Sequence, residues 1–391
     1  MKICDLTQFY SPLSGGVKRY VHEKANYIRE HTDDQHVLIV PGKKTERIGD
    51  DRARVYSVRS PLISRTARYR ALLDLRAVGE ILAREQPDLI ESSDPYQIGW
   101  KAIAFGKSAR VPVVAFYHSH FPEAYLRSAA KLLGARAGKS LMSAAKQYVR
   151  KMYNRFEATL VPSQPLAEIL QEWGVRNTRL VPLGVNIQNF KPDADDAAEN
   201  PHARVEPPRK LLLYVGRLAP EKNTTTLFDA LRILSRRRPG EFYLFVIGDG
   251  PQRQQLEKLK AETESVSWVQ YCTDPAELAR YYRSADLFVH PGTQETFGLV
   301  ALESQACGTP VVGIRGSRLD GIILHDQEGW AAENDPESLA AAIEQFSARD
   351  LKALGNLAAR KAAENYAWPA VFERLFCIYR EVCANYSRAR P

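Results

Sequence analysis

The sequence predicts an α/β protein built from two doubly wound domains, each with a parallel sheet. Short apolar runs alternate with longer amphipathic stretches in both halves of the chain, which is typical of parallel strands that helices cover on both faces. A length of 391 residues exceeds the usual size of one hydrophobic core, so two domains are expected. Such domains bind ligands outside the carboxyl ends of their strands, here in a deep cleft.

Beyond a first strand at the N-terminus, nine apolar runs are interpreted as strands because each ends in small or polar residues. They are 36–42, 87–94, 112–120, 158–163, 210–218, 242–250, 267–271, 287–292 and 310–314. Residues 191–208 are rich in Pro, Ala and acidic side chains, which predicts a linker or surface loop. We therefore expect one domain over 1–190 and another over 209–369, with an amphipathic terminal helix that starts at 368.

The composition is that of an ordinary soluble globular enzyme, with 45% apolar and 26% charged residues. We see no N-terminal secretion signal and no apolar run near the roughly 18 residues that span a bilayer. The five cysteines are scattered without metal-ligand spacing. Structural thiols in a reduced, cytoplasmic protein are the expected outcome.

The positive charge is concentrated in the first half of the chain. Residues 1–190 hold 29 Lys and Arg against 18 Asp and Glu, a formal net charge of +11, whereas 191–391 carry −3. Segment 126–156 has eight basic residues, no acidic one, and apolar residues interleaved at helical spacing. This pattern is typical of an interfacial helix on an anionic membrane. A solvated basic face is the alternative, and no recognised nucleic-acid-binding motif is present.

Two glutamates lie around a predicted helix start in the stretch HPGTQETFGLVALESQACG. Glu295 is in the loop after a strand, and Glu303 follows by eight residues, about 12 Å along a helix. Each carboxylate could bind a vicinal diol, one on a hexose and one on a ribose, with a diphosphate at the N–H groups between them. Alternatively Glu295 caps the helix and Glu303 is solvated, but the apolar neighbours of Glu303 indicate that it needs a buried partner.

The stretch GRLAPEKN follows another strand and places two cations five residues apart across a turn. The planar guanidinium of Arg217 and the mobile ammonium of Lys222 suit a diphosphate leaving group. The alternative is that both are surface residues without a ligand. The Walker pattern GxxxxGK[ST] does not occur, which argues against nucleoside-triphosphate hydrolysis.

Two features of the first half indicate a ligand near its strand ends. Gly15 and Gly16 begin a predicted helix, where they would let the backbone approach a ligand closely. His118 and His120 follow a strand, and either could bond a sugar hydroxyl or stabilise developing charge. Because nothing nearby in the sequence completes a ligand set, we expect no metal there.

These motifs together resemble those of glycosyltransferase family 4, whose members are retaining enzymes with the GT-B fold. The resemblance covers nearly the whole chain and rests on the E-x7-E pattern of Glu295 and Glu303, GRLAPEKN at 216–223, SGG at 14–16 and VPLGVNIQNFKP at 181–192. It implies two Rossmann-like domains facing across a deep cleft, the first for the acceptor and the second for a nucleotide-sugar donor. It also implies that the terminal helix at 370–391 crosses back to the first domain, and that no metal or other cofactor is needed.

The resemblance also implies roles for individual residues. Arg217 and Lys222 would bind the donor diphosphate, and Glu295 would hold hydroxyls of the transferred sugar. Glu303 would bind the ribose, and His118 would contact the sugar near the reacting centre. The full set implied at the donor is Gly15, Gly16, Arg217, Lys222, Glu295, Phe297, Gly298, Leu299 and Glu303, and the set implied in catalysis is His118, Arg217, Lys222 and Glu295.

The stretch AFYHSHFPEAYLR at 115–127 is similar to the branch with sulfoquinovosyl diacylglycerol synthases and phosphatidylinositol mannosyltransferases. That branch uses lipid acceptors. The expected reaction moves a hexose from a GDP- or UDP-sugar to a lipid or lipid-linked acceptor, by an enzyme bound peripherally at the cytoplasmic face of the membrane. The alternatives are a polysaccharide or soluble acceptor, a GT-B nucleotide-sugar epimerase, and a non-enzymatic nucleotide-sugar sensor or scaffold.

Overall fold

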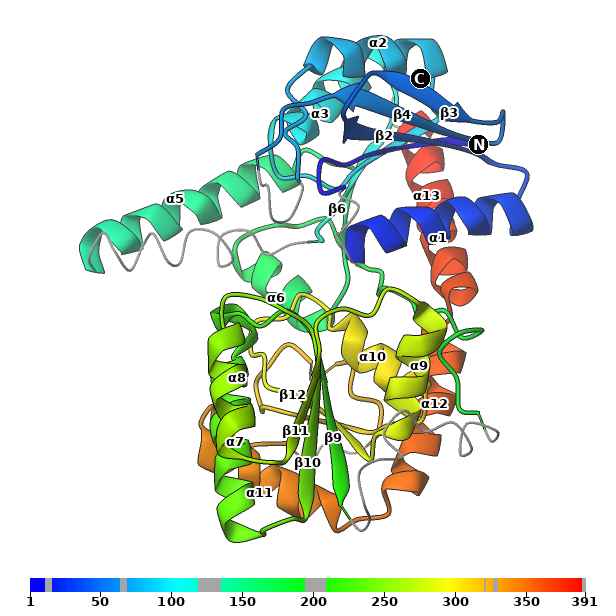
Figure 1. Cartoon of the computed structure of the whole chain (residues 1–391). Helices are drawn as coiled ribbons and strands as arrows, with labels where there is room; N and C mark the ends of the chain where they lie inside the picture. The colour runs from blue at the N-terminus through cyan, green and yellow to red at the C-terminus, as the bar shows by residue number, and fades with distance from the viewer. Residues whose placement is uncertain are drawn as a thin grey trace. The chain divides into compact units, whose positions relative to one another are not determined.

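The computed structural model describes residues 1–10, 16–63, 69–118, 135–193, 209–319, 321–325 and 330–388. The chain divides into two compact units, Met1–Leu183 with Trp368–Pro391, and Gly184–Ala367. We refer to them as the first and the second unit, and each contains its own sheet (Figure 1). Most of the predicted linker, residues 194–208, lies outside the described residues.

The first unit is built on an eight-stranded sheet in the order β3-β4-β2-β1-β5-β6-β7-β8, in which β3 is antiparallel to β4 and the other pairs are parallel. Its strands are β1 Lys2–Leu6, β2 Gln35–Gly42, β3 Glu46–Gly49, β4 Ala53–Arg59, β5 Leu89–Ser92, β6 Val113–Phe116, β7 Ala158–Val161 and β8 Thr178–Leu180. Its helices are α1 Gly16–His31, α2 Leu75–Glu85, α3 Gln97–Ala109, α5 Ala135–Tyr153, α6 Gln164–Glu172 and α13 Trp368–Arg388. The strand order reverses between β1 and β5, so this is the switch point of the sheet.

The second unit contains an all-parallel sheet of five strands in the order β11-β10-β9-β12-β13. The strands are β9 Lys210–Val215, β10 Phe242–Ile247, β11 Val266–Val269, β12 Leu287–His290 and β13 Val311–Gly313. The helices are α7 Thr224–Arg237, α8 Arg253–Glu262, α9 Pro275–Ser284, α10 Leu299–Ala306, α11 Pro336–Ser347 and α12 Leu351–Tyr366, with the 3₁₀ turn η3 at Pro220–Lys222. The switch point of this sheet lies between β9 and β12.

The predicted fold class is confirmed. Each of the nine apolar runs overlaps a strand, because an apolar run without alternation is stable as a strand only when both faces of the sheet are covered. β5, β6, β7 and β12 are buried along their whole length. The sequence did not indicate β3, β4 and β8. The side chains of β3 and β8 are mostly exposed, and those of β4 alternate in burial, so none of the three leaves a continuous apolar run.

Lys24 of α1 is fully buried and connects α13 to the first sheet. Its ammonium donates to Asp5 of β1 at 2.9 Å, to Glu91 of β5 at 3.0 Å and to the hydroxyl of Tyr379 of α13 at 2.9 Å. These three acceptors satisfy all three N–H groups, as a buried ammonium requires. Burial would raise the pKa of Asp5, but Lys24 and His36 outweigh burial and lower it to about 2.

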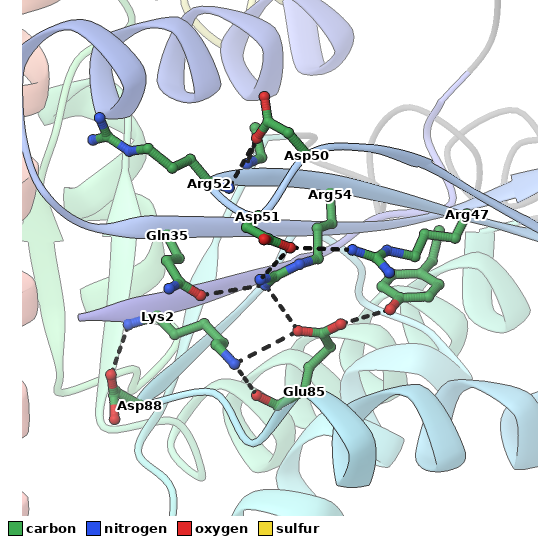
Figure 2. Close-up of polar contacts among 11 residues, drawn as sticks. Lys2, Gln35, Arg47, Asp50, Asp51, Arg52, Arg54, Glu85 and Asp88 are labelled. Carbon is green, nitrogen blue, oxygen red and sulfur yellow. Dashed lines mark hydrogen bonds and ion pairs between the residues drawn. The ribbon is translucent and has the colours of Figure 1, made fainter.

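A second polar cluster of the first unit lies near the amino ends of its strands (Figure 2). Glu85, the last residue of α2, accepts from Arg54 at 3.0 Å and from the hydroxyl of Tyr56 at 2.5 Å. Lys2 donates to the backbone carbonyl of Glu85 at 2.6 Å. Because ligands of such sheets bind at the carboxyl ends of the strands, we assign this cluster a structural role.

Lys24→Met should lower the free energy of unfolding by about 3–5 kcal/mol, because it leaves two carboxylates buried without their cation. Urea denaturation followed by circular dichroism measures the change. The control Lys43→Met removes an exposed lysine of the same unit and should stay within about 0.5 kcal/mol of the unsubstituted protein. A loss below about 1 kcal/mol for Lys24→Met would contradict a stabilising role for the network.

Candidate functional site

The strand order of the second sheet brings two distant loops together at its switch point. β12 pairs in parallel with β9, so the loops that follow these strands begin side by side at the same edge of the sheet. The first loop carries Lys222 and the second carries Glu295, 73 residues later. An open parallel sheet binds its ligand in the crevice outside the strand ends at this point.

Glu295 is the centre of a charged cluster in these loops. Lys222 Nζ lies 2.5 Å from its Oε1, and His290 Nε2 lies 3.4 Å from the same oxygen. The side chain of Glu295 is 13% exposed. Burial would raise the pKa of Glu295, but Lys222 and His290 outweigh burial and hold the pKa well below its usual value. Glu295 is therefore an ionised hydrogen-bond acceptor at neutral pH.

Asn223 fixes the turn that carries Lys222. It has a φ of 55°, in the left-handed region, which asparagine adopts more readily than most residues. Its side-chain amide donates to the backbone carbonyl of Pro291 at 2.9 Å and to the side chain of Asn334 at 2.7 Å. Asn223 thus ties the turn after β9 to the loop after β12. The motif GRLAPEKN contains it, but only the fold reveals the partner in the second loop.

The loop after β12 leads directly into α10, and Gly298 makes this possible. Gly298 is the N-cap residue with a φ of 94°, and a Cβ there would lie 2.3 Å from Leu319 Cδ2, so only glycine fits. It has no side chain to cap the first N–H groups of α10. Phe297 is buried and Leu299 is the first residue of the helix. The positive end of the helix dipole therefore lies next to the loop of Glu295.

Two residues predicted to bind the nucleotide-sugar donor, Arg217 and Glu303, pair with side chains outside the Glu295 cluster. The side chain of Arg217 is 63% exposed and forms an ion pair with Glu221. Glu303 is buried and accepts from the hydroxyl of Tyr282 at 3.1 Å. The prediction of a buried partner for Glu303 is confirmed, and the alternative of a solvated residue is wrong. The estimate of about 12 Å along a helix is also wrong, because α10 begins at Leu299 and the first half of the interval is loop.

The predicted residues of the first unit are only partly described. Gly15 and His120 lie outside the described residues, and Gly16 is the first residue of α1. His118 follows β6 by two residues. Burial, and then the charge of Lys24, lower the pKa of His118, so its imidazole is neutral at pH 7. Within the described part of the chain, its buried Nε2 has no hydrogen-bond partner.

The basic segment 126–156 is described from residue 135 onward, where it forms α5 and the turn after it. Val149, Met152 and Tyr153 of α5 are buried in the core of the first unit, so these three apolar residues do not face a membrane. The basic side chains are exposed, namely Arg136, Lys139, Lys146, Arg150, Lys151 and Arg155. None of the helices described here has the length and apolar character needed to cross a membrane.

Asp94 is a candidate functional residue that the sequence did not indicate. It lies just after β5, at the switch point of the first sheet, and is 1% exposed. Its Oδ2 accepts from the backbone N–H of Gln8 at 2.7 Å, and its Oδ1 has no partner in the described part of the chain. Burial raises the pKa of Asp94 to about 8, and the Gln8 N–H offsets only part of this rise. Carboxyls held neutral in this way are concentrated at functional sites.

Two family models match the chain in succession. The model described as Glycosyltransferase Family 4 matches residues 14–189, and the model described as Glycosyl transferases group 1 matches residues 196–366. The GDP-mannose-dependent alpha-(1-6)-phosphatidylinositol dimannoside mannosyltransferase of Mycobacterium tuberculosis is 33% identical over 376 residues, which cover 94% of this chain and 93% of that protein. This chain belongs to glycosyltransferase family 4.

Two further likenesses concern the branch and the fold of this glycosyltransferase. Sulfoquinovosyl transferase SQD2 of Arabidopsis thaliana is 31% identical over 78% of this chain and 58% of that protein, which agrees with the predicted branch. Sucrose-phosphate synthase of Thermosynechococcus elongatus superposes with a TM-score of 0.76 at 23% identity, over 98% of this chain and 99% of that one. The fold is GT-B and the protein is a glycosyltransferase, so the scaffold and epimerase interpretations are set aside.

Asp94→Asn should change how the stability of this glycosyltransferase depends on pH. In the unfolded chain Asp94 loses its proton near pH 3.8, but in the folded one only near pH 8. Folding therefore takes up a proton between these values, and the free energy of unfolding falls by about 1.4 kcal/mol per pH unit across the window. Asparagine removes this contribution.

Urea denaturation at several pH values between 5 and 8 measures the effect. The Asp94→Asn variant should lose less stability than the unsubstituted enzyme as the pH rises through this range. The control Asp33→Asn replaces an exposed aspartate of the same unit and should follow the unsubstituted enzyme. Parallel curves for Asp94→Asn and the unsubstituted enzyme would show that the carboxyl is not protonated in the fold.

Proposed function

We propose that this enzyme transfers a hexose from a GDP- or UDP-sugar to a hydroxyl of a lipid or lipid-linked acceptor, with retention of the anomeric configuration. The first unit would bind the acceptor and the second unit the donor. The observation that supports this most is the pair of Lys222 and Glu295 at a switch point, next to the start of α10. The relative from M. tuberculosis is named for GDP-mannose and for a phosphatidylinositol dimannoside.

The cations of the second unit suit the diphosphate of such a donor. Lys222 has three N–H groups, of which one serves Glu295 in this structure, so the others can bind phosphate oxygens. Arg217 lies five residues earlier in the chain and is exposed. Its planar guanidinium would bind two phosphate oxygens at once. With the N–H groups at the start of α10, these residues would stabilise the charge that develops on the leaving nucleotide. We therefore propose that no metal or other cofactor takes part.

The acceptors of the second unit suit the hydroxyls of the donor. Glu295, held as an anion by Lys222 and His290, would accept from hydroxyls of the transferred hexose, beside the N–H groups of 297–299. Glu303 would share its carboxylate between Tyr282 and the ribose diol, because a carboxylate has lone pairs for about four bonds.

From the first unit, Gly15 and Gly16 would approach the phosphates, and the neutral His118 would bond the hexose near its reacting carbon. No covalent intermediate is required by this arrangement. The bond between the anomeric carbon and the phosphate oxygen breaks while the acceptor oxygen bonds that carbon on the same face. The acceptor proton passes to the leaving phosphate oxygen. Catalysis would come from positioning and from stabilisation of charge.

Lys222→Ala should lower kcat by about 100-fold or more, because one preorganised cation at the leaving group is lost. The assay combines GDP-mannose or UDP-glucose with vesicles that contain phosphatidylinositol, in the presence of EDTA, and measures release of the nucleoside diphosphate and formation of glycolipid. The control Lys260→Ala replaces an exposed lysine of α8 and should keep the full rate. Absence of turnover with every donor, or a near-normal rate for Lys222→Ala, would contradict the proposal.

We also propose that the exposed basic face of α5 holds the enzyme at the anionic cytoplasmic face of the membrane. Replacing Arg136, Lys139 and Lys151 by Glu should weaken binding to phosphatidylglycerol vesicles by at least about 100-fold at low salt, since each basic residue contributes about 1 kcal/mol near such a surface. Vesicle sedimentation measures this. The matched control reverses three exposed charges of the second unit, Lys260, Lys352 and Arg360. Equal binding by both triple variants would contradict the assignment to α5.

A further inference from the structure

Several buried polar atoms at or just after the carboxyl ends of β5 and β6 have no hydrogen-bond partner in the described part of the chain. Nine buried side-chain atoms in the described part of the chain have no hydrogen-bond partner. Four of them lie on β5 and β6 or within two residues after them: Ser92 Oγ, Ser93 Oγ, Asp94 Oδ1 and His118 Nε2. β5 and β6 are neighbours in the sheet. Leaving a buried polar group unpaired costs about 1–3 kcal/mol, so this group is unfavourable until a partner reaches it.

The place of this group in the fold is that of a ligand site. It adjoins the switch point between β1 and β5, where an open parallel sheet binds its ligand. The bond from the Gln8 N–H to Asp94 Oδ2 joins the chain after β1 to the chain after β5. Asp94 and Ser93 are only 1% and 3% exposed. The first unit thus has polar residues at its switch point, as the second unit has Lys222 and Glu295.

The backbone beneath the group is held in place by α3. A Cβ at Gly99 would lie 2.5 Å from the carbonyl oxygen of Asp94 and 2.2 Å from Met152 Cε. Only glycine allows α3 to approach so closely. Asp94 is therefore presented by a packed part of the first unit, as a preorganised binding residue requires.

The chemistry of the group is neutral. Asp94 and His118 are both uncharged at pH 7, because burial raises the pKa of the carboxyl and lowers that of the imidazole. The charge of Lys24 also lowers the pKa of His118. The ammonium of Lys24 is already bonded to three acceptors, so all its N–H groups are in use. Hydroxyls both donate and accept, so they can pair with a carboxyl O–H, an imidazole nitrogen and serine hydroxyls. A phosphate only accepts and would also need a cation.

We propose that Ser93 and Asp94 form a subsite for the ring hydroxyls of the acceptor, and that this acceptor is a lipid with a neutral polyol or sugar ring in its headgroup. Asp94 donates a hydrogen bond from its carboxyl O–H to one ring oxygen, and the Ser93 hydroxyl accepts from a neighbouring hydroxyl, while His118 keeps its role at the transferred hexose. Any phosphate of the headgroup lies outside this subsite. The inference rests on the proposed function, because it assigns the acceptor to the first unit.

Acceptor kinetics of the full enzyme with GDP-mannose or UDP-glucose test the subsite. Asp94→Ala should raise the KM for phosphatidylinositol by about tenfold or more, since a hydrogen bond to the acceptor is lost and its partner hydroxyl is left unpaired. The KM for the donor should stay unchanged. Asp94→Asn should restore most of the affinity, because its amide still donates. Ser93→Ala tests the neighbouring hydroxyl independently if Asp94→Ala folds poorly. The control Ser347→Ala removes another buried, unpaired hydroxyl, in the second unit, and should not change either KM.

The outcomes separate this inference from the proposed function. If the unsubstituted enzyme is active and neither Asp94→Ala nor Ser93→Ala changes the KM for the acceptor, the subsite is overturned. The proposed transferase activity would still stand. No turnover with any donor would overturn the proposed function itself. Equal rates on diacylglycerol and phosphatidylinositol vesicles would overturn the polyol headgroup. Use of free myo-inositol as readily as phosphatidylinositol would overturn the lipid part of the assignment.

Discussion

The pairing of β12 with β9 is the constraint on which the candidate site depends. The chain builds β10 and β11 on one side of β9 and then returns to place β12 on the other side. The loops after β9 and β12 therefore begin side by side and are joined by side chains, with Asn223 donating to the carbonyl of Pro291 and Lys222 pairing with Glu295. The pairing of the two strands places the carboxylate of Glu295 beside Lys222 Nζ and His290 Nε2. These two nitrogens keep Glu295 ionised despite its burial.

The same topological rule operates in the first sheet with different chemistry. There the switch point holds a neutral carboxyl at Asp94 and serine hydroxyls, whereas in the second sheet it holds an ion pair. An anionic sugar nucleotide suits the charged switch point, because cations stabilise phosphate. A hydroxyl-bearing acceptor suits the neutral one. One architecture, repeated, can thus provide two binding sites that differ in charge.

The hydrogen bonding of buried polar groups differs between the Lys24 network and the residues of the proposed binding sites. Lys24 uses all three of its N–H groups on protein acceptors, and the network it forms attaches α13 to the first unit. Asp94 Oδ1, His118 Nε2 and His290 Nδ1 are equally buried but have no partner among the described residues. Leaving such atoms unpaired lowers the stability of the fold. A ligand that binds beside the switch points would pair with them and so explain their position.

The sequence by itself determined the fold class, ten of the strands and the motifs around Lys222 and Glu295, because apolar runs and turn residues are local signals. Only the tertiary structure decided which of these residues meet. Glu303 accepts from Tyr282, Lys222 pairs with Glu295, and Val149, Met152 and Tyr153 of α5 pack in the core of the first unit. Asp94 had no local signal at all. Its importance arises from burial, and burial and pKa are set by residues distant in the chain, which no window of sequence contains.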